Sequence, residues 1–303
     1  MLIRLHAPSG YPYPIERAER GIAVLRELGY QVEGEGVIIR RHQRFAGTDD
    51  DRLADLHAIG AGGAPGIALM VRGGYGLSRL LERIDYARIA RQVASSGTLM
   101  VGHSDFTAFQ LAYLAQTGGV SFAGPMLSAD FGAEPVDPFM AAHFRAVTTT
   151  PTVTETIAEP QPYDMLLEGT LWGGNLAMLC SLVGTPWMPR IRDGILFVED
   201  VNEHPYRVER MLLQLWQSGV LSGQRAVLLG DFSSYRTTDY DNGYDFGEMV
   251  AWLRATLPIP IFTGLPFGHC ARKMTLPVGG RAVVAPHPQG YTLTLSAYPV
   301  LPA

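Results

Sequence analysis

The feature that most constrains this fold is a pair of short apolar runs, residues 66–71 (GIALMV) and 97–102 (GTLMVG). Runs of this length and composition are typical of strands buried on both faces, as in a parallel sheet. Segments with helical spacing precede and follow them, at 15–28, 48–57 and 105–116. Strands that alternate with helices in this way predict βαβ units, and therefore an α/β fold built on a parallel sheet.

The same patterns predict the other elements. We expect strands at 2–6, 37–39, 194–198, 226–229 and 259–262, helices at 77–84 and 206–217, and β structure in the tail at 281–301. Residues 149–165 are rich in Thr, Pro and Glu and have little helical period, so they are interpreted as a linker. The sequence thus predicts an N-terminal α/β domain over 1–148 and a C-terminal β/α domain over 166–303.

Composition excludes several classes of protein. The formal charge is −5, and no basic run is longer than the pair Arg40-Arg41, so a nucleic-acid partner is not expected. No apolar run approaches the length that crosses a bilayer, and the first residues lack the pattern of a signal peptide, so we expect a cytoplasmic protein without membrane contact. The two cysteines, Cys180 and Cys270, allow neither a disulfide framework nor a CxxC metal site, and no HExxH motif is present.

A serine follows the apolar run at 97–102, in the motif Gly102-His103-Ser104-Asp105. A serine on a strand-to-helix turn can present its hydroxyl above a sheet, and the N–H of Asp105 behind it could then stabilise an oxyanion. The alternative is that Ser104 only caps the helix, a role that serine favours. Phe106 occupies the position of the second glycine in G-x-S-x-G, so an ordinary α/β-hydrolase is disfavoured.

A glycine-rich loop, residues 72–76 (RGGYG), follows the apolar run at 66–71. Gly73 and Gly74 would let backbone N–H groups approach a ligand, either to hold a phosphate or to complete an oxyanion hole. The alternative is a tight turn that needs small residues. The loop matches neither the P-loop nor the dinucleotide fingerprint in full, which argues against a nucleotide-dependent kinase or reductase.

Two further strand ends carry groups suited to acid–base chemistry. Glu199 and Asp200 follow the strand predicted at 194–198, and a carboxylate there can orient a histidine, although a solvated acidic loop would look the same. Among eight histidines, His269 lies in a Gly/Pro loop after a predicted strand, and His204 is its rival. Cys270 is next to His269, but adjacent side chains rarely face each other, so a Cys–His pair is disfavoured.

In their order along the chain, these segments resemble the LD-carboxypeptidase family, serine peptidases that include muramoyltetrapeptide carboxypeptidases and microcin C immunity peptidases. The resemblance covers almost the whole chain. It is carried by HAPSG at 6–10, RFAGT at 44–48, RGGYG at 72–76, GHSDFTA at 102–108, GPM at 124–126, GTLWGGNL at 169–176, FVEDVNEHPYRVERML at 197–212 and GLPFGH at 264–269.

The resemblance implies a Ser-Glu-His triad of Ser104, Glu199 and His269, with an oxyanion hole formed by the N–H groups of Gly74 and Asp105. It implies a flavodoxin-like N-terminal domain, a smaller C-terminal β/α domain and an active site at their interface. It also implies a homodimer that needs neither metal nor organic cofactor. The expected substrate is a murein tetrapeptide, cleaved between meso-diaminopimelate and D-alanine.

Two residues of the glycine-rich loop are expected to contact this substrate, namely Arg72, for its terminal carboxylate, and Gly73. Two alternatives remain open at this point. A microcin C-type immunity peptidase would cleave an aminoacyl-nucleotide amide and would need an aromatic platform, for which the available residues are Trp172, Trp187 and Trp216. A non-enzymatic binding protein would lack a triad member, and here all three residue types are present.

Overall fold

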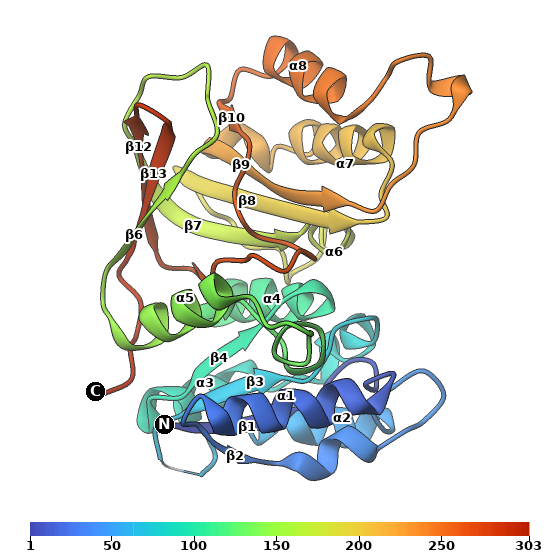
Figure 1. The fold of residues 1–303 in the computed structure, drawn as a ribbon, viewed down its shortest axis with the longest axis vertical. Coiled ribbons are helices and arrows are strands. Elements are labelled where there is room, and N and C mark those ends of the chain that lie inside the picture. Colours follow the sequence, from blue (N-terminus) through green and yellow to red (C-terminus); the bar gives the residue numbers. More distant parts are fainter. Residues whose placement is uncertain (63, 303) are drawn as a thin grey trace.

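The computed structural model describes residues 1–62 and 64–302, which form two sheets with helices between and around them (Figure 1). The N-terminal half occupies the lower part of the view and the C-terminal half the upper part. The predicted α/β class and two-domain arrangement are confirmed by this architecture and by its match to a solved structure described below.

The first sheet has the strand order β11-β5-β4-β3-β1-β2. Its first five strands along the chain are parallel: β1 (Leu2–His6), β2 (Gln31–Glu33), β3 (Ile67–Met70), β4 (Leu99–Gly102) and β5 (Ser121–Ala123). The order 2-1-3-4-5 is that of flavodoxin-like folds, in which ligands bind outside the carboxyl ends of the strands. Every residue of β3 and β4 is buried, as the two apolar runs predict.

The helices of this half are α1 (Ile15–Glu27), α2 (Asp49–His57), α3 (Tyr86–Ser96), α4 (Thr107–Thr117) and α5 (Pro138–Thr149). Helix α2 begins with a capping box, in which Thr48 and Asp51 each satisfy the backbone N–H of the other. Two local predictions were wrong. Residues 37–39 form part of the 3-10 helix η1 (Glu35–Ile39), not a strand, and residues 77–84 form two 3-10 turns, η2 (Leu77–Arg79) and η3 (Leu81–Arg83), not an α-helix.

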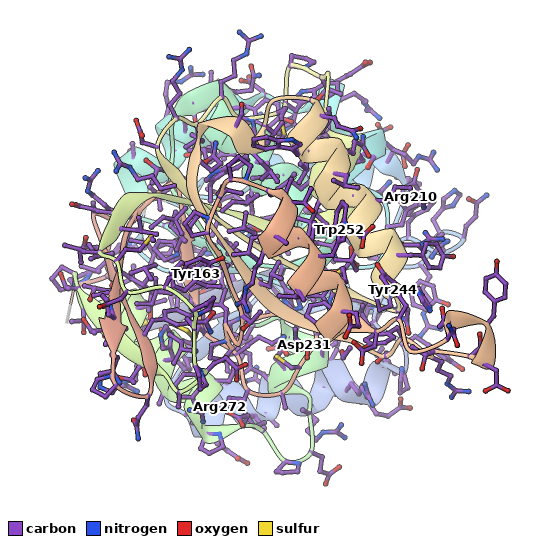
Figure 2. All side chains as sticks on the ribbon, turned by 90° about the horizontal axis from the view of Figure 1, so that it is seen from above. Tyr163, Arg210, Asp231, Tyr244, Trp252 and Arg272 are labelled. Carbon is purple, nitrogen blue, oxygen red and sulfur yellow. The ribbon has the colours of Figure 1, made fainter. Side chains whose placement is uncertain are left out.

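The second sheet has the order β10-β9-β8-β7-β12-β13-β6. Four strands are parallel: β7 (Leu167–Asn175), β8 (Gly194–Val201), β9 (Gln224–Ser233) and β10 (Ile261–Phe262). Antiparallel pairing adds β12 (Arg281–His287), β13 (Gly290–Ser296) and β6 (Val153–Ile157). The helices are α6 (Leu176–Ser181), α7 (Pro205–Gln217) and α8 (Phe246–Thr256). In Figure 2, α7 with Arg210 and α8 with Trp252 cover the sheet from above.

The chain crosses between the two sheets more than once. Strand β6 lies within the predicted linker 149–165, yet it is the edge strand of the second sheet. After His269 the chain returns to the first sheet, where β11 (Leu276–Val278) pairs antiparallel with β5. The boundaries 1–148 and 166–303 therefore stay a prediction, because part of the C-terminal segment completes the N-terminal sheet.

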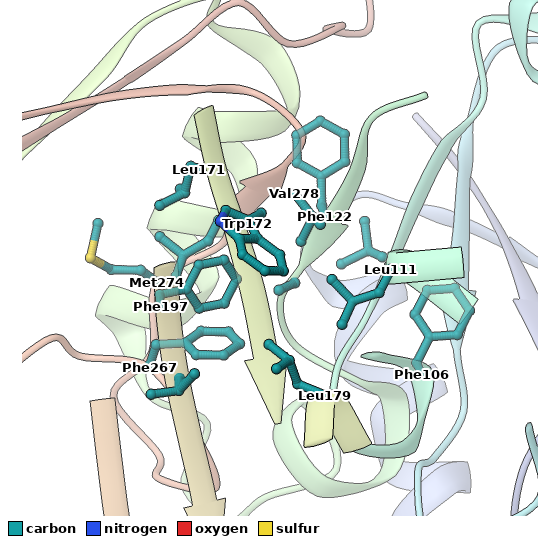
Figure 3. Packing of buried hydrophobic residues seen from close by; sticks show 14 of the residues in the cluster. Phe106, Leu111, Phe122, Leu171, Trp172, Leu179, Phe197, Phe267, Met274 and Val278 are labelled. Atoms are coloured by element: carbon teal, nitrogen blue, oxygen red, sulfur yellow. The ribbon is translucent and has the colours of Figure 1, made fainter. Parts of the chain in front are cut away.

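Helix α4 holds the two halves together. Its residues from Thr107 to Leu114 are all buried, which is typical of a helix covered on every side. Figure 3 shows Phe106 and Leu111 on one side of this core, and Trp172, Phe197 and Phe267 on the other. None of the helices in the described part of the chain has the length and hydropathy that a bilayer crossing requires.

Candidate active site

Ser104 lies on the sharp turn between β4 and α4. Its φ is +62°, a left-handed conformation that costs a residue with a side chain about 1–2 kcal/mol. The residue that precedes the short 3-10 helix here is His103, and no side chain caps this helix. The capping alternative for Ser104 is therefore contradicted, and the strained turn is typical of a functional position.

The glycine loop lies against this serine. A Cβ placed on Gly73 would be 2.8 Å from Ser104 Cβ and 2.9 Å from its Oγ, so only glycine fits there. Gly74 is exposed and has a φ of +100°. A Cβ placed on it would have only the Cα of Gly10 within 4 Å, at 3.9 Å. The loop therefore approaches the serine closely and leaves space beside Gly74.

Asp105 ties the serine turn to this loop. Its Oδ2 accepts hydrogen bonds from the hydroxyl of Ser9 at 2.6 Å and from the N–H of Leu77 at 3.1 Å. The side chain is buried, and burial raises the pKa of this carboxyl above its usual range. The Asp105 side chain therefore links the serine turn to the neighbouring loops. Its backbone nitrogen lies 3.3 Å from the position that a Cβ on Gly73 would occupy.

The loop between β10 and β11 brings His269 to Ser104. His269 Nε2 lies 3.1 Å from Ser104 Oγ, across 165 residues of chain. On the other side of the ring, Nδ1 lies 2.7 Å from Oε2 of Glu199, which is fully buried on β8. Serine, histidine and glutamate therefore form a continuous chain of hydrogen bonds at the interface of the two halves.

The surroundings of His269 raise the pKa of its imidazole. Burial lowers the pKa of its imidazole, but the hydrogen bond to Glu199 and the charge of that carboxylate raise it more, so the net pKa lies above the usual value. In its neutral form such a histidine can accept the serine proton, and the imidazolium that then forms is stabilised by the Glu199 carboxylate.

Asn175 and Asp200 hold Glu199 in place. The Asn175 amide donates to Glu199 Oε1 at 3.2 Å and to Asp200 Oδ1 at 3.0 Å, and Asp200 Oδ2 accepts from the N–H of Ala177 at 2.9 Å. Both acidic side chains are buried, so the alternative of a solvated acidic loop is wrong. Asn175 was not singled out in the sequence, although its place at the end of a strand in GTLWGGNL could have marked it.

The other sequence candidates lie elsewhere. His204 is at the start of α7, and its Nε2 lies 3.1 Å from Asp241 Oδ1. Cys270 directs its sulfur to the carbonyl oxygen of Arg272 at 3.1 Å, and burial raises the pKa of its thiol to about 11, so a reactive thiolate is not formed near neutrality. The structure thus places His269, and neither His204 nor Cys270, beside Ser104.

A buried ion pair lies behind the histidine, and sequence reasoning missed it. Lys273 Nζ is 2.6 Å from Asp130 Oδ1, with both side chains almost wholly buried, and 3.4 Å from His103 Nε2. These residues line a cavity of about 170 Å³ that also borders His269. Burial and the Lys273 charge keep the pKa of His103 well below its usual value, so this ring stays neutral.

The three tryptophans considered for an aromatic platform are partly or wholly buried. Trp172 is fully buried, and its indole N–H donates to Gln224 Oε1 at 2.8 Å. Trp187 and Trp216 are partly buried and pack against the core. Arg72, by contrast, lines a cavity of about 160 Å³ that borders Gly74, and its guanidinium donates to the carbonyl of Tyr11 at 2.9 Å.

Taken together, the site holds a serine hydroxyl, a histidine within hydrogen-bond distance of it and a buried carboxylate that orients the histidine, with the glycine loop packed against the serine. Within residues 1–62 and 64–302, no group of three or more His, Cys, Asp and Glu residues is arranged to hold a metal ion. The arrangement fits acyl transfer through a serine ester.

Two family models match this chain. The model of the LD-carboxypeptidase N-terminal domain covers residues 3–124, and the model of the LD-carboxypeptidase C-terminal domain covers residues 168–284. The two matched ranges contain Ser104 in the first, and Glu199 and His269 in the second.

Individual relatives agree with the family models. A probable murein peptide carboxypeptidase of Bacillus subtilis is 32% identical over 92% of this chain and 86% of its own length. A murein tetrapeptide carboxypeptidase of Pseudomonas aeruginosa is 31% identical over 86% of this chain and 87% of its own. The crystal structure of muramoyltetrapeptide carboxypeptidase from Oxalobacter formigenes superposes with a TM-score of 0.92, at 46% identity, over 99% of this chain and 100% of that one.

The microcin C7 self-immunity protein shares the fold at lower identity. The Escherichia coli protein is 23% identical over 88% of this chain and 84% of its own length. Its structure in the wild-type apo state gives a TM-score of 0.86 at 21% identity, over 99% of this chain and 97% of that one. At this identity the likeness shows the fold alone.

Proposed function

Because this chain belongs to the LD-carboxypeptidase family and is a serine-type carboxypeptidase, we propose that it releases the terminal D-alanine from murein tetrapeptides. The bond cleaved would join the L-centre of meso-diaminopimelate to D-alanine. The observation that carries this proposal is the hydrogen-bonded chain from Ser104 through His269 to Glu199. The name of the Pseudomonas aeruginosa relative supports the choice of substrate.

The first half of the proposed reaction forms an acyl-enzyme. Ser104 Oγ attacks the scissile carbonyl carbon while its proton passes to His269 Nε2, 3.1 Å away. Glu199 accepts a hydrogen bond from Nδ1 and stabilises the imidazolium that forms. The C–N bond then breaks, the imidazolium gives its proton to the amine of D-alanine, and an ester to Ser104 remains.

The second half regenerates the enzyme. A water molecule gives a proton to His269 and attacks the ester carbonyl, and the imidazolium returns that proton to Ser104 Oγ as the ester bond breaks. In both halves the carbonyl oxygen becomes negatively charged and would accept hydrogen bonds from the N–H groups of Gly74 and Asp105. Removal of one such donor typically costs about 3–4 kcal/mol of transition-state stabilisation.

Two further parts of the proposal rest on the family resemblance. One is that the protein acts in the cytoplasm, and the other is that it forms a homodimer. Light scattering after size-exclusion chromatography measures the molar mass directly, and a mass near that of one 33.0 kDa chain at micromolar concentration would contradict the dimer.

The reaction is tested by incubating the protein with a murein tetrapeptide that contains meso-diaminopimelate and measuring free D-alanine. We expect release by the wild type and none by Ser104→Ala, with the melting temperatures of both proteins measured as a folding control. An aminoacyl-nucleotide amide serves as the competing substrate. Cleavage of this amide alone would replace the proposed substrate, and equal release by Ser104→Ala would show that the nucleophile lies elsewhere.

A further inference from the structure

A small cavity lined by two arginines borders the glycine loop and shares no lining residue with the cavity of the buried ion pair. Its volume is about 160 Å³, and its lining consists of Gly10, Tyr11, Tyr13, Arg44, Arg72, Gly74 and Tyr75. Its lining thus includes two arginines and three tyrosines and no acidic residue. It borders Gly74, whose N–H is the proposed oxyanion donor, so whatever binds here lies next to the scissile bond.

Three loops build this cavity and fix one another through the backbone. The N–H of Gly10 donates to the carbonyl of Gly73 at 3.1 Å, and the N–H of Ala46 donates to that of Ser9 at 3.0 Å. A Cβ on Gly10 would lie 3.1 Å from Gly73 O, 3.6 Å from Arg44 O and 4.0 Å from Arg72 Cδ. The loops after β1 and β3 and the loop that carries Arg44 therefore meet at one point, and Arg44 is held beside Arg72.

The charge of this cavity is not neutralised from within the protein. Arg72 donates to the carbonyl of Tyr11, and the Arg44 guanidinium lies over the ring of Tyr75, 5.8 Å from its centroid. Among the residues that the structure describes, neither arginine forms an ion pair with a carboxylate. The cavity behind His269 differs, because its Lys273 is already paired with Asp130 at 2.6 Å. Of these two cavities, the one that borders the glycine loop has arginines without a carboxylate partner among the described residues, and these can bind an anion.

We propose that this cavity binds the free carboxylate of the departing D-residue, with Arg44 and Arg72 as its donors. The inference rests on the proposed function and adds Arg44 and the cavity itself to it. Arginine suits this role because its planar guanidinium can bind a carboxylate through two parallel hydrogen bonds. The site would thereby select a chain end and reject a peptide that continues beyond the D-residue.

Bond lengths place the carboxylate within reach. The scissile carbonyl carbon and the carboxylate carbon of the departing residue are joined by three bonds, so they lie at most about 4 Å apart. The cavity borders the glycine that would hold the scissile carbonyl oxygen. The side-chain carboxylate of diaminopimelate lies several bonds further from the reacting carbon, so the terminal carboxylate is the better match to a cavity in this place.

The test compares a tetrapeptide that ends in D-alanine with the same peptide ending in D-alaninamide. We expect the wild type to prefer the free acid by about 10- to 100-fold in kcat/KM, the range of a hydrogen bond to a charged group. Arg44→Met should lower kcat/KM for the free acid by a similar factor and leave the amide unaffected. Arg41→Met is the matched control, since Arg41 is on the same loop but lies outside the cavity lining, over the ring of Tyr11.

A second pair of peptides identifies which carboxylate is bound. In these peptides L-lysine replaces diaminopimelate, which removes the side-chain carboxylate. The effect of Arg44→Met should persist with the lysine peptide and disappear with the amide. The opposite pattern, or an equal loss on the acid and the amide, would overturn the proposal.

Binding without turnover separates this inference from the proposed function. Calorimetry with Ser104→Ala should show weaker binding of the free acid when Arg44→Met is added and unchanged binding of the amide. A wild type that cleaves neither peptide but shows this Arg44-dependent binding would contradict the proposed reaction and keep the carboxylate site. If binding of the free acid does not depend on Arg44, the proposed carboxylate site is contradicted, whichever substrates the wild type cleaves.

Discussion

The Glu199 carboxylate lies 2.7 Å from Nδ1 of His269, and this hydrogen bond joins strand β8 to a loop 70 residues further along the chain. Burial by itself lowers the pKa of His269, but the bond to Glu199 and its charge outweigh burial and leave the pKa raised above about 6.5. In the proposed mechanism only the neutral imidazole accepts the Ser104 proton, so the position of this pKa would set the acidic limit of activity.

We therefore expect kcat/KM of the wild type to fall as the pH drops through a midpoint above about 6.5, where His269 becomes protonated. Glu199→Gln removes the negative charge that raises the pKa of His269, so the midpoint should move to lower pH. The kcat should fall by about 10⁴-fold, because the imidazole tautomer is no longer held. An NMR titration of the His269 ring gives the same midpoint without turnover. Glu203→Gln, in the loop after β8 and paired with Arg207, is the control and should not move it. An unchanged midpoint in Glu199→Gln would contradict this account.

Gly73→Ala places a methyl group 2.9 Å from the Ser104 hydroxyl, inside van der Waals contact. The serine side chain or the loop must move, and a displacement of this size typically costs about 100-fold in rate. We expect kcat/KM to fall by at least that factor with little change in melting temperature. Gly36→Ala is the matched control, because a Cβ at this position would have no neighbouring atom within 4 Å. Full activity in Gly73→Ala would mean that the loop does not approach the nucleophile as described.

The strained turn at Ser104 has a measurable effect on stability. With φ at +62°, glycine is tolerated there and alanine is not, so Ser104→Gly should be more stable than Ser104→Ala by about 1 kcal/mol. Urea unfolding measures the difference. Ser95 on helix α3 provides the control, since alanine is favoured over glycine at a helical position and the order of the two variants should reverse. Equal stability of the two Ser104 variants would exclude a strained turn.

The Lys273–Asp130 pair should be strongly coupled. Breaking a buried ion pair from one side leaves an uncompensated charge, so Lys273→Met and Asp130→Asn should each cost about 3–5 kcal/mol of unfolding free energy. The double variant should cost clearly less than their sum. In the exposed pair Arg225–Asp193, Arg225→Met should cost at most about 1 kcal/mol. Additive costs for Lys273 and Asp130 would show that their contact carries no energy.

The parts of this structure that the sequence predicts are those set by short-range patterns. Apolar runs identify β3 and β4 because strands buried on both faces have no polar alternation. Ser104 and Glu199 could be found because each lies at the carboxyl end of such a strand, where α/β folds place their ligands. His269 could be preferred over His204 only through its Gly/Pro loop and the family resemblance, since spacing alone does not say which loop reaches Ser104.

The parts that could not be predicted depend on contacts between distant segments. Strand β11 is only three residues long, and its pairing with β5 has no local signal. Arg44 resembles any other exposed arginine until the loop that carries it is placed beside Arg72. From the sequence alone Lys273 would be expected at the surface, because nothing in the sequence indicates that Asp130 pairs with its charge in the interior. Residues 37–39 are apolar, and an apolar run this short is compatible with a 3-10 helix as well as with a strand.

The return of β11 to the first sheet has a consequence for the order of events during biosynthesis. Its residues, 276–278, are translated after nearly all of the chain, yet they pair with a strand completed by residue 123. Until then the edge of β5 has no partner, and His269, seven residues before β11, has no fixed place beside Ser104. The proposed nucleophile is therefore translated long before the strand that helps to fix the proposed base beside it.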